Sequence, residues 1–446
     1  MSIHSNDGKT WSTKLARIGE SSRKGRSIVF NNLGHVIDLP YLLDCFRRLD
    51  GNRAIGTDGI TKEIYEGDLT ANATELLISL KRGTYRPRPA RLVEIPKEDG
   101  GSRPLAISCF EDKIVQLAVS RILEQIYEPI FLDCSHGYRP GRNTHDALKA
   151  LNQAMFRTRR GAVLEIDLSK FFNTVPHEQL LGLIRRRISD PRLLALIGVL
   201  IRTPLQLSSG EIKPQTIGVP QGSIASPILA NIYLHYVLDE WFAELKANHF
   251  RSRTCEMIRY ADDMAFVFTF PEEAAKFANV LPKRLAKFGL KMNLEKSSLQ
   301  PCGDKVVADI AEAKASFPSM NFVGFRVSWR KARSGKYRPW ARPRSDRKES
   351  TLARIREYLR GQLNCSNHMR VLKKLAQVVN GWVNYFGVSD SKPYVQDFID
   401  TVRIMVHRWF NRRGKKGSMN WKRLDGILVA ANFRRNFKIK SLFAVD

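Results

Sequence analysis

Two adjacent aspartates interrupt an apolar stretch of the chain. Asp262 and Asp263 stand in IRYADDMAFVF, with apolar residues on both sides of the pair. Neighbouring carboxylates repel each other and resist removal from water. A third aspartate, Asp167, ends another apolar run, AVLEID, about 95 residues earlier. Three carboxylates brought together suit hard, oxygen-seeking cations such as Mg²⁺ or Mn²⁺, and not zinc.

Such a trio has the chemistry that phosphoryl transfer needs. Two cations roughly 3.5–4 Å apart activate an attacking 3′-hydroxyl and neutralise a leaving pyrophosphate. For any one of these aspartates alone, a turn residue or a helix cap is the simpler interpretation. An apolar strand that ends in Asp, together with an apolar hairpin that carries Asp-Asp at its tip, favours the metal site.

The elements predicted around the acids belong to a mixed α and β body. A buried strand is predicted over 162–168, followed by a helix that Pro176 opens. Two strands around a tight turn are predicted over 257–268, which places Asp262 and Asp263 near the tip. A Gly/Pro loop, GVPQGS, leads into a helix predicted from about 226 to 242.

Further elements flank this body on both sides. Upstream, the pattern predicts a loose N-terminal arm with a short helix, and two short strands joined by the turn 97–101. The other predicted elements are helices over 73–83, 110–127 and 272–288, a short strand in NFVGFRV, and basic helices from Ser345 onwards.

The charge of the chain points to a polyanionic partner. Lys and Arg number 73 against 44 Asp and Glu, which gives a net charge of +29. Residues 321–446 hold 29 of the basic residues and 8 of the acidic ones. A mixed-charge body followed by a basic quarter predicts a catalytic module with a nucleic-acid grip. A merely soluble or ribosome-associated basic protein is the alternative.

The cysteines and the apolar runs exclude several classes of protein. Six cysteines occur, and no two stand at CxxC spacing, so a zinc knuckle has no support. No apolar run approaches 18 residues, so we expect no membrane span. Scattered single cysteines and the lack of a signal-peptide core predict a cytoplasmic location. An organelle is the less favoured location, because Asp7 and Glu20 interrupt the Ser/Lys/Arg-rich N-terminus.

Three segments together resemble the palm motifs of reverse transcriptases, and among these the group II intron-encoded reverse transcriptase/maturases. They are EIDLSKFFNTV, GVPQGSIASPILANIYL and RYADD. GTDGIT, IPKEDGGSRPLAI and HGYRPGRNTHDAL precede them in the family's order, and GLKMNLEKS and FVGF follow. VVNGWVNYFG resembles the maturase thumb, and WFNRRGKKGSMNWKRLDGIL resembles the short DNA-binding segment after it. The resemblance covers roughly Leu39 to Ile427.

The resemblance implies an α+β fold shaped as a right-hand polymerase. Fingers and palm would surround an antiparallel sheet, followed by an α-helical thumb and a small basic C-terminal segment. We expect an N-terminal arm over 1–38, fingers and palm over 39–327, a basic linker over 328–348, a thumb over 349–410 and a basic DNA-binding-like segment over 411–446. LVAANFRRNFKIKSLFAVD ends the chain without CxxC or His, so we expect neither an HNH endonuclease nor, for want of an acidic domain, RNase H.

The resemblance also assigns roles to residues of the site. Asp167, Asp262 and Asp263 would bind two Mg²⁺ ions, with Mn²⁺ as a substitute, and the carbonyl of Leu168 would add a ligand. Lys296 matches the family's proton donor to pyrophosphate, although a surface lysine is the common case.

Other residues would bind the incoming nucleotide. Lys97 and Arg103 flank the fingers turn and would hold the triphosphate. Gln221 and Gly222 lie in the VPQG loop, which the family places against the nucleotide. Phe172 matches the aromatic gate that selects dNTPs; since Phe171 is adjacent, we expect one ring to face the core and the other the site.

The nucleic acid itself would meet the palm and the basic tail. The expected contacts are Tyr260, Arg412, Arg413, Lys415, Lys416, Lys422 and Arg423. Trp382, Tyr385 and Phe386 in GWVNYF stand at helical spacing, which favours a core role over base stacking.

The function that the resemblance implies is RNA-directed DNA synthesis, with intron RNA binding and assistance in splicing. The partners would be an RNA template, structured intron-like RNA, a DNA primer or target and dNTPs, in a bacterial, nucleoid-associated setting. A free-standing bacterial reverse transcriptase, domesticated for antiviral defence or DNA repair, has the same motifs. A non-catalytic RNA-binding splicing factor belongs to another class, and the intact Asp167 and Asp262-Asp263 count against it.

Overall fold

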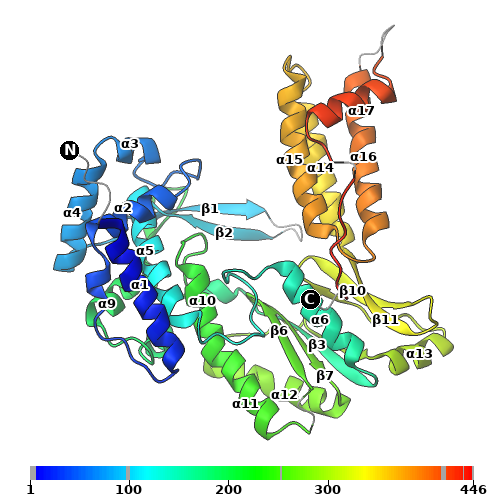
Figure 1. The fold of residues 1–446 in the computed structure, drawn as a ribbon, viewed down its shortest axis with the longest axis horizontal. Coiled ribbons are helices and arrows are strands. Elements are labelled where there is room, and N and C mark those ends of the chain that lie inside the picture. Colours follow the sequence, from blue (N-terminus) through cyan, green and yellow to red (C-terminus); the bar gives the residue numbers. More distant parts are fainter. Residues whose placement is uncertain (1–6, 97–100, 252–253, 413–417, 435, 444–446) are drawn as a thin grey trace.

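The molecule is built from three parts. The structure is a computed structural model that describes residues 7–96, 101–251, 254–412, 418–434 and 436–443 of the 446-residue chain. Figure 1 shows a helical lobe on one side, a sheet-bearing body below, and an upright helical bundle on the other side. We call these parts the fingers, the palm and the thumb. The expected α+β right-hand arrangement is therefore confirmed.

The fingers pack around one long buried helix, α5, which lies at the predicted position. A β-hairpin of β1 and β2 reaches from this lobe over the palm (Figure 1). The turn between these two strands, residues 97–100, lies outside the described residues. The elements of the fingers are α1 Asp7–Lys24, η1 Gly34–Val36, α2 Leu39–Arg48, α3 Lys62–Glu66, α4 Leu69–Arg82, β1 Ala90–Pro96, β2 Ser102–Ile107, α5 Phe110–Tyr127, α9 Pro191–Ile201, β4 Leu205–Gln206 and β5 Ile212–Lys213.

The N-terminal arm is more ordered than the sequence predicts. Helix α1 packs along α5 and buries Leu15 and Ile18 in the fingers core. The hydroxyl of Ser22 donates a hydrogen bond to the carbonyl of Ile126 at 2.5 Å. Trp11, whose ring lies 5.6 Å from that of Tyr41, adds to this docking, although the surrounding polar residues suggest a loose segment.

The palm is centred on a four-stranded antiparallel sheet with the strand order β6-β7-β3-β8. Along β3, Leu164 and Ile166 belong to a core shared with the fingers, whereas Val163 belongs to a core shared with the thumb. This alternation follows from the two-residue period of a strand. The elements of the palm are α6 Thr144–Arg157, β3 Gly161–Asp167, α7 Phe171–Thr174, α8 His177–Ile184, α10 Ser226–Leu234, η2 His235–Asp239, α11 Glu240–Asn248, β6 Glu256–Tyr260, β7 Asp263–Phe268, α12 Pro271–Lys287, β8 Ser298–Cys302, α13 Asp304–Glu312, β9 Met320–Phe322, β10 Phe325–Lys331 and β11 Tyr337–Pro343.

The helix that follows the VPQG loop contains a π-helical turn. The sequence predicts one helix over 226–242, but α10 passes into a π turn, His235–Asp239, and then into α11, which ends at Asn248. A π turn accommodates an extra residue and is frequent at functional sites. The residues from Ile228 to Asp239 are buried on all sides of the helix. The sequence therefore has no one-sided apolar stripe whose spacing could reveal the change from an α-helical to a π-helical period.

The segment expected to be a basic linker is folded into a β-hairpin. NFVGFRV forms two strands, β9 and β10, around Val323 and Gly324, which both have positive φ angles. Residues 328–348 then hold the end of β10, all of β11 and the start of α14. Val327, Trp329 and Ala341 alternate with arginines and point into the core. This two-residue apolar period is inconspicuous among so many basic residues.

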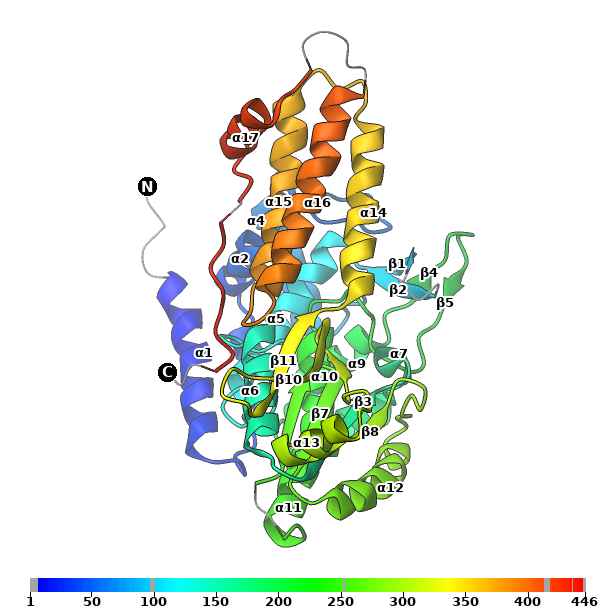
Figure 2. The ribbon, with the colours of Figure 1, turned by 90° about the vertical axis from the view of Figure 1, so that its right-hand side faces the viewer.

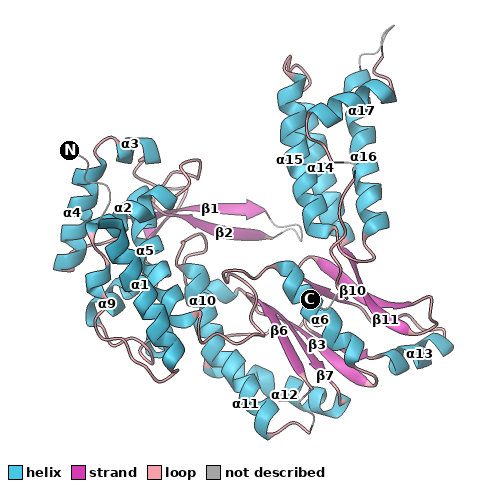
Figure 3. Cartoon of the chain, viewed as in Figure 1, coloured by secondary structure: helices cyan, strands magenta, loops and turns pink. Residues whose placement is uncertain are grey.

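The thumb is a helical bundle that shares a core with the palm. Figure 3 shows its helices standing above the strands of the palm. The ring of Phe325 in β10 lies 5.1 Å from that of Phe386 in α15, and Trp382 stacks on Phe398 at 3.9 Å. These contacts confirm the expected core role of GWVNYF. The thumb helices are α14 Ser345–Gly361, α15 His368–Phe386, α16 Lys392–Asn411 and α17 Trp421–Ala430.

Packing and hydrogen bonds hold these parts together, since all six cysteines are free. No helix in the described ranges combines the length and the apolar composition that crossing a bilayer requires.

Candidate active site

The hairpin of β6 and β7 places the two adjacent aspartates at its tip. Strand β6 ends at Tyr260 and β7 begins at Asp263, so Ala261 and Asp262 form the turn. Ala261 has a φ angle of +58°, in the left-handed region that non-glycine residues seldom adopt. Asp263 is the cross-strand partner of Asp167 in β3. The fold therefore brings the three predicted carboxylates together.

A turn that precedes β8 holds the backbone and side chain of Asp167. The amide of Asn293 donates to the carbonyl of Asp167 at 2.8 Å, and its side-chain Nδ2 donates to Oδ2 at 3.0 Å. The backbone N–H of Asp167 donates to Ser297 Oγ at 3.2 Å. Lys296, the predicted proton donor, lies in this same turn, between Asn293 and Ser297, and its side chain is exposed.

The hydrogen bonds around Leu168 indicate which way its carbonyl points. Asp167 and Ser169 bond with the 291–293 segment through the carbonyl of Asp167 and the N–H of Ser169. Since the polar groups of successive residues point to opposite sides of a strand, the carbonyl of Leu168 points to the side of β7. This orientation suits the ligand role that the resemblance implies.

Burial and mutual repulsion perturb the carboxyl groups. Burial raises the pKa of Asp263 to about 7, and repulsion from Asp262, Glu165 and Asp167 adds to this rise. The N–H of Val323, which donates to Oδ2 of Asp263 at 2.7 Å, opposes it. Burial also raises the pKa of Asp262, to which Asp167 adds and which Arg103 opposes. The protein alone thus disfavours the charged form of both carboxyl groups.

The carboxylates fit a hard divalent cation in kind and in charge. All of the candidate donors are oxygens, as Mg²⁺ prefers, and a bound cation would favour the charged form that burial disfavours. Within the described part of the chain, no three His, Cys, Asp or Glu side chains are already arranged as a closed metal site. Asp167, Asp262, Asp263 and the Leu168 carbonyl are therefore candidate ligands.

A fourth carboxylate, Glu165, was not predicted. It lies two residues before Asp167 on the same face of β3, and burial raises its pKa to about 7. Its oxygens accept hydrogen bonds from Asn321 N–H at 3.2 Å and from Ser298 Oγ at 3.4 Å. The two-residue period of the strand places Glu165 on the same face as Asp167 and could have revealed it. In AVLEID, however, Glu165 is a single acid among apolar residues, which drew attention to the strand rather than to the acid.

The fingers hairpin contributes positive charge to the site. Arg103 in β2 lies opposite Ile95, and its charge lowers the pKa of both Asp262 and Tyr138. Arg103 is therefore near enough for its charge to act on the carboxyl group of Asp262. The second predicted triphosphate ligand, Lys97, lies outside the described residues.

The VPQG loop docks on strand β2. The amide of Ala106 donates to the carbonyl of Gln221 at 2.6 Å. Gly222 has a φ angle of +107°, and a Cβ atom there would lie 2.6 Å from the carbonyl oxygen of Ala106, so only glycine fits. The side-chain Oε1 of Gln221 is buried and has no hydrogen-bond partner among the described residues. A buried acceptor without a partner is unfavourable unless a ligand satisfies it.

The two adjacent phenylalanines after β3 take different environments. Phe171 is only 2% exposed and lies in the core shared with the fingers, whereas Phe172 is half-buried. The amide of Val219 donates to the carbonyl of Phe172 at 2.7 Å, which ties this residue to the VPQG loop. The inward-facing ring is therefore that of Phe171, and the role of Phe172 at the site stays a prediction.

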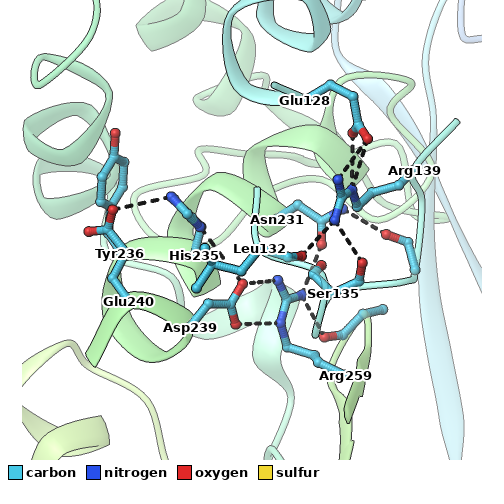
Figure 4. Close-up of polar contacts among 12 residues, drawn as sticks. Glu128, Leu132, Ser135, Arg139, Asn231, His235, Tyr236, Asp239, Glu240 and Arg259 are labelled. Carbon is cyan, nitrogen blue, oxygen red and sulfur yellow. Dashed lines mark hydrogen bonds and ion pairs between the residues drawn. The ribbon is translucent and has the colours of Figure 1, made fainter. Parts of the chain in front are cut away.

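A buried ion pair supports the hairpin tip (Figure 4). The guanidinium of Arg259 donates to both carboxylate oxygens of Asp239, at 2.8 and 2.5 Å, and both side chains are fully buried. The same guanidinium donates to Asn231 Oδ1 at 2.9 Å and to the carbonyl of Ala261 at 3.2 Å. Asp239 is the last residue of the π turn. Arg259 therefore connects this turn directly to the strained residue beside the aspartates.

A loop from the HGYRPG segment closes over the tip. The amide of His136 donates to the carbonyl of Arg259 at 2.8 Å, and Asn231 Nδ2 donates to the carbonyl of Gly137 at 2.8 Å. A Cβ atom on Gly137 would lie 2.4 Å from the nitrogen of Ala261, so the close approach requires glycine. The sequence did not single out Arg259, Asp239 or Asn231, because partners distant in sequence form this network.

The predicted nucleic-acid contacts are spread over the palm and the end of the thumb. Tyr260 is half-buried beside the ring of Tyr138, 6.5 Å away. Arg412 is exposed and donates to the carbonyls of Trp409 and Leu363, so it also caps helix ends. Lys422 and Arg423 are exposed on α17, whereas Arg413, Lys415 and Lys416 lie outside the described residues.

Comparison with known proteins agrees with this geometry. Residues 95–327 match the family described as reverse transcriptase (RNA-dependent DNA polymerase), and residues 348–425 match the maturase-specific domain of group II introns. The group II intron-encoded protein LtrA of Lactococcus lactis subsp. cremoris is 37% identical over 236 residues, which are 52% of this chain and 38% of LtrA. Protein YkfC of Escherichia coli K12 is 38% identical over 188 residues, 42% of this chain and 49% of YkfC. An uncharacterized 91 kDa protein in a cob intron of Schizosaccharomyces pombe is 37% identical over 46% of this chain and 25% of its own length. The chain thus spans less than half the length of each of these relatives.

Proposed function

The chain belongs to the reverse transcriptase family, and from this we propose that it is an RNA-directed DNA polymerase that extends a primer 3′-hydroxyl with dNTPs. The observation that carries the proposal is the pairing of Asp167 with Asp263 across β3 and β7, beside Asp262 in the turn. A non-catalytic RNA-binding protein has no need of three repelling, partly buried carboxylates at one point.

Asp167, Asp262, Asp263 and the carbonyl of Leu168 would hold the cations. When bound, a pair of Mg²⁺ ions would activate the primer hydroxyl and neutralise the leaving pyrophosphate. The protein's own contribution is to hold the carboxylates ready, through Asn293 and Ser297 at Asp167 and through Val323 at Asp263.

The residues around the carboxylates would bind and orient the dNTP. Arg103, whose charge acts on Asp262 from the fingers, would bind the triphosphate, and Lys97 is the second expected ligand. The unpartnered Oε1 of Gln221 would accept a hydrogen bond from the nucleotide, which Gly222 allows to approach the backbone. Lys296, in the turn that holds Asp167, would protonate the leaving pyrophosphate.

A primer extension assay tests the proposal. Purified protein, an RNA template with an annealed DNA primer, dNTPs and Mg²⁺ should give full-length complementary DNA, and EDTA should abolish the product. A matched reaction with rNTPs should give little product. If the folded wild-type protein extends no primer with either Mg²⁺ or Mn²⁺, the catalytic proposal is wrong.

The ring of Phe172 is proposed to exclude the 2′-hydroxyl of ribonucleotides. Replacing it with Val removes the bulky ring beside the VPQG loop, so discrimination between dNTP and rNTP should fall roughly ten- to a hundredfold in kcat/KM. Single-nucleotide incorporation with dCTP and CTP measures this ratio. The matched control is Phe171→Leu, which alters the buried neighbour and should lower the melting temperature without changing the ratio. Unchanged discrimination in Phe172→Val would place the gate elsewhere.

The maturase-domain match supports a second proposed role, the binding of intron RNA and assistance in its splicing. The basic residues on and before α17, Arg412, Lys422 and Arg423, would contact nucleic acid. Splicing of a group II intron transcript at low Mg²⁺, with and without the protein, tests this role separately from primer extension.

A further inference from the structure

The hairpin of β10 and β11 presents arginines directly opposite one another on one face. The cross-strand pairs are Arg326 with Arg342, and Arg330 with Arg338. Trp340, paired with Ser328, lies between them on the same face. The opposite face is apolar and buried in the core shared by palm and thumb. We call the four arginines and Trp340 the arginine face.

Such an arrangement opposes folding unless something compensates for it. Like charges directly opposite each other destabilise an antiparallel pair. One carboxylate, Asp390, accepts from Arg338 at 2.6 and 2.7 Å and from Arg330 at 3.3 Å. Taken together, the four guanidinium groups and this one carboxylate have a net charge of +3.

The first arginine pair has no acidic partner in the described chain. Arg326 donates to Ser319 Oγ at 2.9 and 3.1 Å, and Arg342 donates to the hydroxyl of Tyr394 at 3.3 Å. Both acceptors are neutral oxygens. A ligand that supplies several negative charges in a row would relieve the repulsion that the protein leaves uncompensated.

Aromatic rings hold these arginines in place. The guanidinium groups of Arg330 and Arg342 lie over the ring of Trp340, at 5.7 and 5.5 Å from its centroid. Arg342 also lies 5.6 Å from the ring of Tyr394. Stacking uses the faces of the guanidinium and leaves its N–H edges available for phosphate. An arginine already fixed in this way loses less side-chain entropy when it binds.

The arginine face begins just past the β9–β10 turn, whose Val323 donates to Asp263. Strands β10 and β11 lie below the thumb, on the side of the molecule opposite the helices of the fingers (Figures 1 and 2). Arg326 and Arg330 are exposed there. Primer extension by variants of these arginines decides whether a nucleic acid bound to this surface is distinct from the template and primer.

We propose that the arginine face binds the phosphate backbone of a structured RNA outside the site of synthesis. The inference rests on the proposed function only in taking RNA as the ligand. An acidic protein is the less favoured occupant, because protein interfaces have an apolar centre and here the central ring is covered by guanidinium groups. Double-helical RNA offers regularly spaced phosphates and is recognised largely through its backbone and shape.

The test is the variant Arg326→Gln with Arg342→Gln, which removes the pair that has no acidic partner. Its matched control is Lys276→Gln with Lys283→Gln, which removes the same charge from exposed positions on α12. Because a repulsive pair is removed, the melting temperature of the arginine variant should not fall. The probe is an RNA duplex with blocked 3′ ends, titrated at several KCl concentrations.

We expect the arginine variant to bind the duplex at least about tenfold more weakly at low salt. Its slope of log affinity against log salt should be shallower by about 2, one unit for each phosphate that an arginine no longer neutralises. The lysine control should show less than half of either change. Extension of a short, preannealed template and primer should keep the wild-type kcat and dNTP KM.

Three outcomes would overturn the inference. Wild-type duplex affinity in the arginine variant, or equal losses in both variants, would mean that the face has no specific role. A parallel loss of primer extension would place these arginines in the site of synthesis. Loss of binding to polyglutamate with unchanged RNA binding would indicate an acidic protein as the occupant. Failure of the wild type to extend a primer, with the RNA result as expected, would refute the proposed polymerase function alone.

Discussion

Replacing Asp262 or Asp263 with Asn should reduce primer extension at least about a thousandfold and leave the fold and RNA affinity intact. The substitution keeps the shape and removes the charge that would hold the cations. In Asp263→Asn, the amide oxygen of the new side chain can still accept from the N–H of Val323, so the hairpin keeps its link to β9. Steady-state extension on an RNA template, with binding of the same template measured separately, gives both quantities.

The same variants should change the pH dependence of stability in the absence of metal. Burial raises the pKa of Asp263 to about 7, above its usual value of 3.8, so the folded protein binds an extra proton between these limits. Its contribution to stability is full below about pH 4 and is lost as the pH rises through about 7. In EDTA, Asp263→Asn should therefore be more stable than the wild type at pH 8, and Mg²⁺ should raise the melting temperature of the wild type alone.

Asp112 supplies the matched control for these variants. It is a buried carboxyl group in the fingers whose pKa burial also raises to about 7, and it accepts from the hydroxyl of Tyr85 at 2.5 Å. Asp112→Asn should show the same kind of pH effect on stability with normal extension and a normal response to Mg²⁺. If Asp262→Asn and Asp263→Asn extend primers as well as Asp112→Asn does, the carboxylates are not the catalytic centre.

Most of the palm could be predicted because its signals are local. The apolar runs before Asp167 and around Asp262 mark the strands, and Pro176 marks the start of a helix, without reference to distant residues. Helix α5 was predicted at Phe110–Tyr127, where the structure has it. The composition of such a buried strand or helix, together with the turn residues that flank it, is enough to predict it.

The remaining features depend on contacts that no local pattern encodes. Residues 328–348 contain many arginines and only a few apolar residues. The alternation of apolar and polar residues that forms β10 and β11 is therefore inconspicuous, and the high charge suggests a linker. The π turn at His235–Asp239 lies in a segment buried on all sides, where the helical period leaves no trace. Arg259 is a further case, because its partners come from α10, the π turn and the hairpin tip.

The buried pair of Arg259 and Asp239 supports the turn that holds Asp262, the proposed metal ligand, and its disturbance should impair catalysis more than stability. Ala261 is held at a φ angle of +58°, and the guanidinium of Arg259 binds its carbonyl from beneath. Removing one partner of a buried ion pair typically costs about 3–5 kcal/mol, so an alanine variant would test folding alone. Arg259→Lys keeps the charge next to Asp239 and removes the fork that also reaches Asn231 and Ala261.

We expect Arg259→Lys to lower kcat by about 10- to 100-fold with a nearly unchanged KM for dNTP, since small displacements of reacting groups have effects of this size. The Mg²⁺ concentration for half-maximal activity should rise as well, because Asp262 and Asp263 are held less firmly. A merely structural arginine would change neither quantity in the folded protein. Arg187 is equally buried, and it binds Ser22 Oγ and the carbonyl of Gly25 far from the palm site. Arg187→Lys should therefore lower the melting temperature without altering the Mg²⁺ dependence, and the same Mg²⁺ shift in both variants would refute a positioning role for Arg259.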